Sequence, residues 1–310
     1  MLFTFVASMV LSSRAGAHVS LLLANIIYGA NYTIARIPMN GYVGSSGFIL
    51  LRVVGAAILF LLTGLLVGKN KITPSDHLRL FLCACFGVAF NQLLFFKGLS
   101  ITGPINAAIM MLCSPLVVAG ISFVNGTEKI KIHVLLGMGL GMLGACCLLT
   151  KGFSILPFSS GSAAGDALIF LNAAAWGIYL VLVKPMIQKY ATATVMQWVF
   201  FYGTLAVLPF GFTQALQIDW SNMPIHVIWA ILYVVIGTTY VAYFLNNHAL
   251  ALLSPTIVTV YIYLQPVLAS LFAIALGADR WQWIQWVSLG LVFGGLYLVN
   301  FRTRSSHENS

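Results

Sequence analysis

Polar and aromatic side chains recur at helical spacing in an otherwise apolar stretch near residues 226–249. Tyr240, Tyr243, Phe244, Asn247 and His248 follow the i, i+3, i+4, i+7 and i+8 pattern of one helix face. Aromatic rings supply apolar contact and an amide orients polar groups, so this face suits a small amphipathic ligand. Hydrogen bonding between neighbouring helices is the alternative. His248 could also exchange protons near neutral pH, or simply pack.

Other polar side chains also lie inside apolar stretches, where such groups usually face a helix-bundle interior or a water-filled cavity. Asn31 follows Gly29, and this pairing favours either close helix approach or local unwinding that frees carbonyl groups. The remaining candidates are Asn91, Gln92, Asn106, Tyr179, Thr259, Tyr263 and Gln265. For each of them, ligand binding and helix-to-helix bonding are both open.

Arg52 lies about nine residues, or ~13 Å, inside an apolar stretch that begins near residue 43. A charge at this depth indicates a function by default. Its guanidinium could hold a carboxylate or phosphate group of a ligand. It could instead extend toward the membrane surface or bond helix carbonyls.

Acidic residues are few, and none lies in the middle of an apolar stretch. They are Asp76, Glu128, Asp166, Asp219, Asp279 and Glu308. The buried carboxylate of many proton-coupled pumps is therefore missing. The sequence also lacks a nucleophile motif, a metal-ligand cluster and paired carboxylates at membrane depth, so we expect no enzyme activity, no metal and no cofactor. Glycines at 139–144 match a dinucleotide-binding pattern, but no strand precedes them and helix packing explains them.

Membrane-spanning helices must position these residues. The chain has 310 residues, of which 60% are hydrophobic and 7% charged, and its mean hydropathy is +0.98. Soluble domains carry about 25% charged residues, so the sequence predicts an all-α membrane protein. A span needs about 20 apolar residues, and we expect ten transmembrane helices. Their approximate ranges are 19–38, 43–67, 78–98, 104–124, 132–150, 165–187, 194–213, 226–249, 255–276 and 282–300.

The second half of the chain repeats the first. Tyr28-Gly29 is matched by Trp176-Gly177, 148 positions later. Four further pairs, each 151 positions apart, are Pro104 and Pro255, Pro115 and Pro266, Glu128 and Asp279, and Gly144 and Gly295. Because each copy holds five spans, an odd number, the second copy must be inverted in the bilayer. We expect two inverted five-helix repeats at 18–151 and 165–301, a linker at 152–164, and tails at 1–17 and 302–310.

Two prolines, Pro115 and Pro266, lie about eleven residues inside their predicted spans. A proline at such a position removes a helix hydrogen bond and kinks the helix. We expect these two residues to act as hinges when one half of the protein rocks against the other.

Positive charge is distributed unequally between the predicted loops. A net charge of +9 would suit nucleic acid in a soluble protein, but the basic residues lie mostly at span ends, so we expect membrane lipid and no nucleic acid. The side with both tails carries ten basic residues and the other side four, which predicts that both termini are cytoplasmic. We expect an integral protein of a bacterial inner membrane.

In several of its motifs the sequence resembles the drug/metabolite transporter (DMT) superfamily, specifically its EamA-type ten-span transporters. The resemblance rests on Tyr-Gly-Ala-Asn at 28–31, Trp-Gly-Ile-Tyr at 176–179, and Pro115 and Pro266, each followed thirteen positions later by an acid. Ala278 replaces a glycine that is usual in the family, which leaves the fold assignment unchanged. In similar proteins the third, fourth, eighth and ninth spans surround a central cavity, so the resemblance implies that the candidate residues line it.

The sequence and the resemblance together predict a secondary transporter that exports small metabolites, such as amino acids or amphipathic compounds, by alternating access. One alternative is an exchanger of sugar phosphates or nucleotides that uses Arg52. The other is a membrane-embedded lipid-handling enzyme, which the missing catalytic groups disfavour. The expected partners are a small-molecule solute and membrane lipid, and a homodimer is left open.

Overall fold

The computed structural model describes residues 13–67, 71–102, 104–150, 163–275 and 283–304, and within these ranges the regular structure is entirely helical. The elements of the first half are α2 (Arg14–Ile34), α3 (Arg36–Met39), α4 (Ser45–Val67), α5 (Pro74–Ala84), η1 (Cys85–Phe90), α6 (Asn91–Ile101), α7 (Pro104–Met111), α8 (Ser114–Val124) and α9 (Ile132–Leu149). Those of the second half are α10 (Ala163–Lys189), α11 (Thr192–Leu216), α12 (Ile225–Leu232), η2 (Tyr233–Val241), α13 (Ala242–Leu252), α14 (Pro255–Val260), η3 (Tyr261–Tyr263), α15 (Leu264–Ala275) and α16 (Trp283–Arg304).

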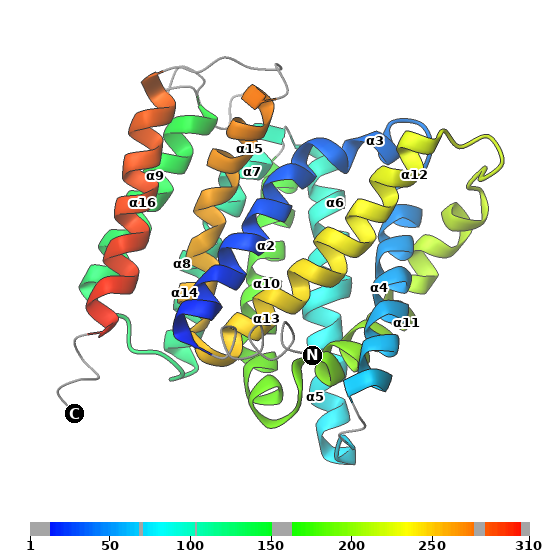
Figure 1. Cartoon of the computed structure of the whole chain (residues 1–310), viewed down its shortest axis with the longest axis horizontal. Coiled ribbons are helices and arrows are strands. Elements are labelled where there is room, and N and C mark those ends of the chain that lie inside the picture. The colour runs from blue at the N-terminus through cyan, green and yellow to red at the C-terminus, as the bar shows by residue number, and fades with distance from the viewer. Residues whose placement is uncertain (1–12, 68–70, 103, 151–162, 276–282, 305–310) are drawn as a thin grey trace, which may run out of the picture.

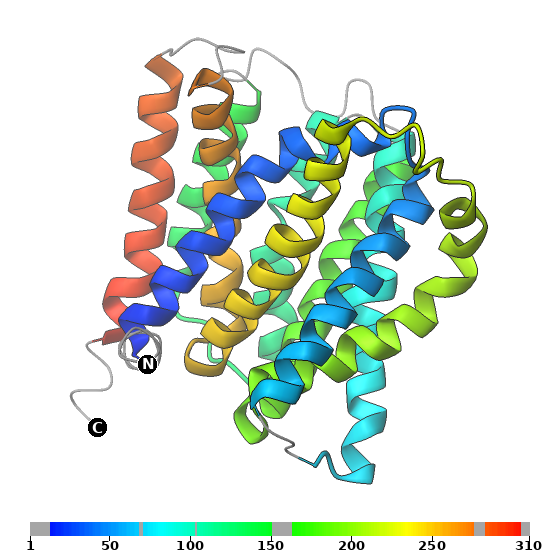
Figure 2. The same ribbon diagram turned by 45° about the vertical axis from the view of Figure 1, so that its right-hand side comes forward.

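The helices run alternately up and down between two ends of one bundle (Figure 1). We call the end where α2 begins and α16 finishes the terminal end, and the end that carries α3 the distal end (Figures 1 and 2). Helix α9 runs from the terminal to the distal end, whereas α16, its equivalent in the second half, runs the opposite way beside it (Figure 1). This antiparallel relation is the one that an inverted repeat requires.

Nine helices in the described ranges are long and apolar enough to cross a membrane. Helix α2 spans the same bundle with 21 residues, but its polar residues, including Asn25 and Asn31, make it less apolar than the others. With α2 the described ranges hold ten crossings, and the prediction of an all-α membrane protein is confirmed. The first crossing starts at Arg14, five residues before the predicted start at 19. The Ser13 side chain accepts the Gly16 N–H and so caps the N-terminus of α2 at this earlier position.

Irregular segments occur at equivalent places in the two halves. The crossing α5–η1–α6 contains a π-helix, and so does α12–η2–α13; Cys85 and Tyr233, where the two begin, are 148 positions apart. A second pair of breaks lies between α7 and α8, just before Pro115, and at the short 3₁₀ segment η3, just before Pro266. Broken helices in both halves are typical of transporters that bind solute at the repeat interface.

Equivalent helices of the two halves also pack directly on each other, α4 on α11 and α9 on α16. A Cβ atom on Gly137 would lie 2.7 Å from the carbonyl oxygen of Gly295, so α9 and α16 approach to backbone distance there. Small residues allow such close contact between membrane helices. Gly29 has the same role between α2 and α15, since its Cβ would meet Leu268 at 2.8 Å, and α2 is continuous through it.

Candidate solute-binding cavity

A cavity of about 590 Å³ lies between the two halves of the chain. Its wall takes residues from α2, α4, α6, α7 and α9 and from α10, α13, α14, α15 and α16. The wall includes Leu99, Leu149 and Ile284, which lie near the distal ends of α6, α9 and α16. It also includes Ala35 and Arg36, which lie where α2 passes into α3 at the same end. The cavity therefore opens toward the distal end.

The terminal end of the same space is closed by contacts that join the two halves. Glu128 Oε1 accepts the backbone N–H of Thr256 at 3.1 Å. His18 Nδ1 and the Tyr261 hydroxyl share a hydrogen bond of 2.7 Å. The structure thus shows a cavity that is open at one end and closed at the other.

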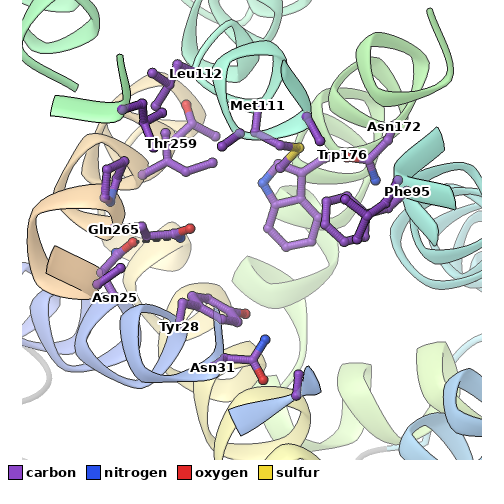
Figure 3. Close-up of a pocket in the computed structure, with 18 of the residues that line it drawn as sticks. Asn25, Tyr28, Asn31, Phe95, Met111, Leu112, Asn172, Trp176, Thr259 and Gln265 are labelled. Carbon is purple, nitrogen blue, oxygen red and sulfur yellow. Dashed lines mark hydrogen bonds between the residues drawn. The ribbon is translucent and has the colours of Figure 1, made fainter. Parts of the chain in front are cut away.

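One face of α2 supplies a row of polar groups to the cavity. Asn25, Tyr28 and Asn31 are spaced three residues apart, and all three line the wall (Figure 3). Asn25 Oδ1 accepts a hydrogen bond from Gln265 Nε2 at 3.0 Å, which links α2 to α15. Asn25 and Tyr28 were not among the candidates from sequence, although their regular spacing with Asn31 is a signal that could have identified them.

Several amide atoms of the wall are buried without a well-formed hydrogen bond to the described residues. They are Asn31 Oδ1, Asn172 Oδ1 and both side-chain polar atoms of Gln92. Gln92 is 4% exposed and lies close enough to the Tyr243 hydroxyl to interact with it. The Nδ2 group of Asn172 donates to the backbone carbonyl of Asn91. Because buried polar groups are normally hydrogen-bonded, these atoms are candidates for contact with water or solute.

The opposite part of the wall is apolar and aromatic. Trp176, Phe95 and Met111 lie together across the cavity from Asn25 and Gln265 (Figure 3). The Trp176 ring packs edge-on against Tyr243 at a centroid separation of 5.7 Å, which fixes its orientation. A solute in this cavity meets Trp176 and Phe95 together with the amide of Asn172 on one side, and the amides of Asn25 and Gln265 on the other (Figure 3).

Arg52 lies in the wall and is 9% exposed. Its Nε donates to the Thr239 hydroxyl at 3.1 Å, and its guanidinium carbon is 6.0 Å from the centroid of the Phe48 ring. Thr239 belongs to η2, and its hydroxyl donates in turn to the Val234 carbonyl at 2.8 Å. The π-helix therefore holds the side chain that orients Arg52.

The charge of the wall is positive. Its charged members among the described residues are Arg36, at the mouth, and Arg52, deeper inside, and its described members include no aspartate or glutamate. Among all the residues that the structure describes, no group of three or more His, Cys, Asp or Glu side chains is placed to hold a metal ion.

The structure brings many of the sequence candidates to the cavity wall. These are Asn31, Arg52, Asn91, Gln92, Tyr243, Thr259 and Gln265, together with the predicted hinge residue Pro266. The other predicted hinge residue, Pro115, is buried at the start of α8, outside the wall. Asn106 lies in α7, and its side chain is outside the described part.

Five other candidates lie away from the wall. Tyr179 donates to Asn247 Oδ1 at 2.8 Å, and both are fully buried. Tyr263 is packed against Gly141, and His248 stacks on Phe244. The Tyr240 hydroxyl is hydrogen-bonded to that of Thr63 on α4.

For Tyr240 the reason lies in the π-helix η2, which ends at Val241, between Tyr240 and Tyr243. A π-helix has i to i+5 bonds, so its turns are wider than those of an α-helix. Residues on either side of η2 therefore do not continue one α-helical face. Beyond it, Tyr243 and Asn246 face the cavity, while Asn247 is turned toward Tyr179 of α10.

Comparison with known proteins agrees with this architecture. Residues 16–150 and 163–301 each match the model of the EamA-like transporter family. An uncharacterized transporter of Archaeoglobus fulgidus is 28% identical over 241 residues, 78% of this chain and 81% of that protein. An uncharacterized transporter of Bacillus subtilis is 23% identical over 264 residues, 84% of this chain and 86% of that protein.

A probable terminal-alkyne amino-acid exporter of Streptantibioticus cattleyicolor is 21% identical over 284 residues, which cover 92% of this chain and 93% of the exporter. A solved crystal structure superimposes with a TM-score of 0.76 at 18% identity, covering 94% of this chain and 99% of the other, and at that identity it supports the fold alone.

The fold, the cavity and these relatives define an integral membrane transporter. The chain belongs to the EamA-like transporter family, within the drug/metabolite transporter superfamily.

Proposed function

We propose that this protein exports small amphipathic metabolites, such as amino acids, by alternating access through the central cavity. The observation that carries the proposal is a space enclosed by both halves, open at the distal end and closed at the terminal end by bonds between the halves. An inverted repeat can exchange these two states by rocking one half against the other. The breaks before Pro115 and Pro266 supply hinge positions next to the cavity.

The lining supports a solute with both apolar and polar parts. Trp176, Phe95 and Met111 offer apolar area, and the amides of Asn31, Gln92 and Asn172 offer hydrogen bonds. The relative named as an amino-acid exporter is consistent with such a solute. With the termini in the cytoplasm, as the loop charges predict, the cavity faces away from the cytoplasm, the state in which an exporter releases its cargo.

Flux measurements on purified protein in liposomes test this proposal. Vesicles loaded with each of the twenty amino acids should show protein-dependent efflux that saturates with concentration for at least one of them. Saturation separates a carrier from a channel. Flux equal to that of protein-free vesicles for every amino acid would overturn the proposal.

Exchange of phosphate esters is a second candidate, which the basic side chain of Arg52 in the cavity wall favours. The same assay with glucose 6-phosphate and a nucleoside monophosphate tests it directly.

A further inference from the structure

We propose that Arg52 is the carboxylate anchor of the transporter and restricts its cargo to solutes with one free carboxylate. This inference rests on the proposed function and specifies the solute of the same cavity. It starts from the side chain itself, which is buried, lines the cavity and makes one hydrogen bond to the described residues, from Nε to Thr239.

The two terminal nitrogens of the Arg52 guanidinium are left available to bind a ligand. Its Nε is bound to Thr239, but neither terminal nitrogen hydrogen-bonds to a described residue. Those two nitrogens form the planar fork that binds a carboxylate. The Tyr28 ring lies within electrostatic reach of the same guanidinium and lines the same wall, so its O–H is placed to reach a bound anion. The Tyr243 hydroxyl beside it donates to the Gly87 carbonyl at 3.2 Å.

A purely structural role for Arg52 does not account for this environment. A buried guanidinium normally pairs with an acid, because an unpaired buried charge is costly. The cavity wall holds no acid among its described residues, and the described ion pair of the chain, Lys189 with Asp76, lies at the terminal end. A charge kept without a protein partner beside a cavity is explained by a partner that arrives with the solute.

The number of charges favours a carboxylate over a phosphate monoester. Arg52 is the one cation among the described residues of the inner wall, since Arg36 lies in α3 at the mouth. It neutralises a single negative charge. A phosphate monoester carries about −1.5 to −2 charges at neutral pH and would enter the cavity with charge left unpaired.

The unpaired amides extend the argument to a zwitterion. An ammonium group has donors and no acceptor, so it needs oxygen atoms, and Asn31 Oδ1 and Asn172 Oδ1 are buried without partners in the described structure. Amide oxygens hold an ammonium without adding a negative charge that would compete for Arg52. The aromatic wall at Trp176 and Phe95 then receives the rest of the molecule (Figure 3).

Matched solute pairs test the proposal in the liposome assay. Each amino acid that the wild-type protein carries is compared with its carboxamide as a competitor of flux. The carboxamide should compete at least tenfold more weakly, because a charge-assisted bidentate contact is lost. In Arg52→Gln the half-saturation concentration of the acid should rise at least tenfold, and the difference between acid and carboxamide should disappear.

Further variants separate direct contact from general charge and from misfolding. Lys97→Gln removes a positive charge from the exposed face of α6 near the distal end, outside the cavity wall, and should leave the discrimination unchanged. Thr239→Val removes the hydroxyl that orients Arg52 and should raise the half-saturation concentration of the acid but not of the carboxamide, and Thr239→Ser should restore it. Thermal melts in detergent should show that Arg52→Gln is folded, and Arg52→Lys, which keeps the charge without the fork, should also bind the acid more weakly.

Equal competition by acid and carboxamide in the wild type would overturn the carboxylate anchor while leaving the transporter intact. The carboxylate anchor would also be overturned if Thr239→Val and Arg52→Lys discriminated between acid and carboxamide as well as the wild type does. Faster flux of glucose 6-phosphate than of any amino acid would overturn it too. Absence of flux for every amino acid is a different result, which contradicts the proposed function itself.

Discussion

Glu128, in the turn that follows α8, accepts the backbone N–H of Thr256 in the first turn of α14, at 3.1 Å. An acid of the first half thus binds the N-terminus of a helix in the second half. The first amides of a helix lack intrahelical acceptors and carry partial positive charge, so a carboxylate is favoured there. This contact spans the two halves at the terminal end and has to break if the cavity is to open at that end.

Glu128→Gln should shift the protein toward a state that is open at the terminal end, because a neutral amide accepts the Thr256 N–H more weakly than a carboxylate does. A charge at a helix N-terminus contributes about 0.3–1 kcal/mol, so the ratio of open to closed forms should rise about two- to fivefold. Pulsed electron paramagnetic resonance between spin labels at Asn125 and Leu252 measures the two populations.

Asp219→Asn is the matched control for that experiment. Asp219 lies in the distal loop between α11 and α12 and bonds Ser221 and Asn222 of its own loop. The control should leave the label distances unchanged. Identical populations in Glu128→Gln and the wild type would show that the contact does not hold the terminal end closed.

Tyr179→Phe should reduce stability and leave solute affinity unchanged. The Tyr179 hydroxyl donates to Asn247 Oδ1, both residues are fully buried, and neither lines the cavity. Removing the donor leaves a buried acceptor unpaired, which costs about 1–3 kcal/mol. The thermal melting temperature should fall while the half-saturation concentration for flux stays constant. A raised half-saturation concentration at unchanged stability would place Tyr179 in solute binding after all.

Gly137→Ala should destabilise the contact between α9 and α16, whereas Gly139→Ala should not. A Cβ on Gly137 would meet the Gly295 carbonyl and Val299 at 2.7 Å, so the two helices have to separate. A Cβ on Gly139 meets nothing within 4 Å, and alanine favours a helix by about 1 kcal/mol over glycine. Melting temperatures of the two variants in one detergent test this, and equal values would argue against close packing of α9 on α16.

The proposed orientation predicts which loops an impermeant thiol reagent reaches in intact cells. In a background without the five native cysteines, Ser221→Cys in the distal loop should be labelled and Ser13→Cys at the terminal end should not. Permeabilised cells supply the control, in which both positions should react. Labelling of Ser13→Cys alone in intact cells would reverse the orientation.

The sequence predicts the crossings well because length and hydropathy decide whether a helix can span a bilayer. It also identifies Arg52, since a charge that deep in an apolar stretch stands out without any knowledge of its neighbours. Asn25 and Asn31 lower the hydropathy of α2, and the same two residues line the cavity. The weaker hydropathy signal of α2 therefore comes from its place in the cavity wall.

The π-helices could not be predicted from sequence periodicity. The stripe from Tyr240 to His248 assumes 3.6 residues per turn, and η2 interrupts that regularity before Tyr243. Whether Asn247 faces a cavity or a tyrosine depends on the position of α10, and Tyr179, which bonds it, lies 68 positions away. Tertiary packing therefore decides whether a polar side chain in a span faces the cavity or a neighbouring helix.

The most direct test of alternating access is the simultaneous measurement of both ends of the cavity. Spin-label pairs at Asn40 and Trp283 report on the distal mouth, and pairs at Asn125 and Leu252 report on the terminal end. During solute turnover in liposomes, the distal pair should gain a shorter distance while the terminal pair gains a longer one. Distances that stay fixed at both ends, or that increase together, while the solute is being carried would contradict the account.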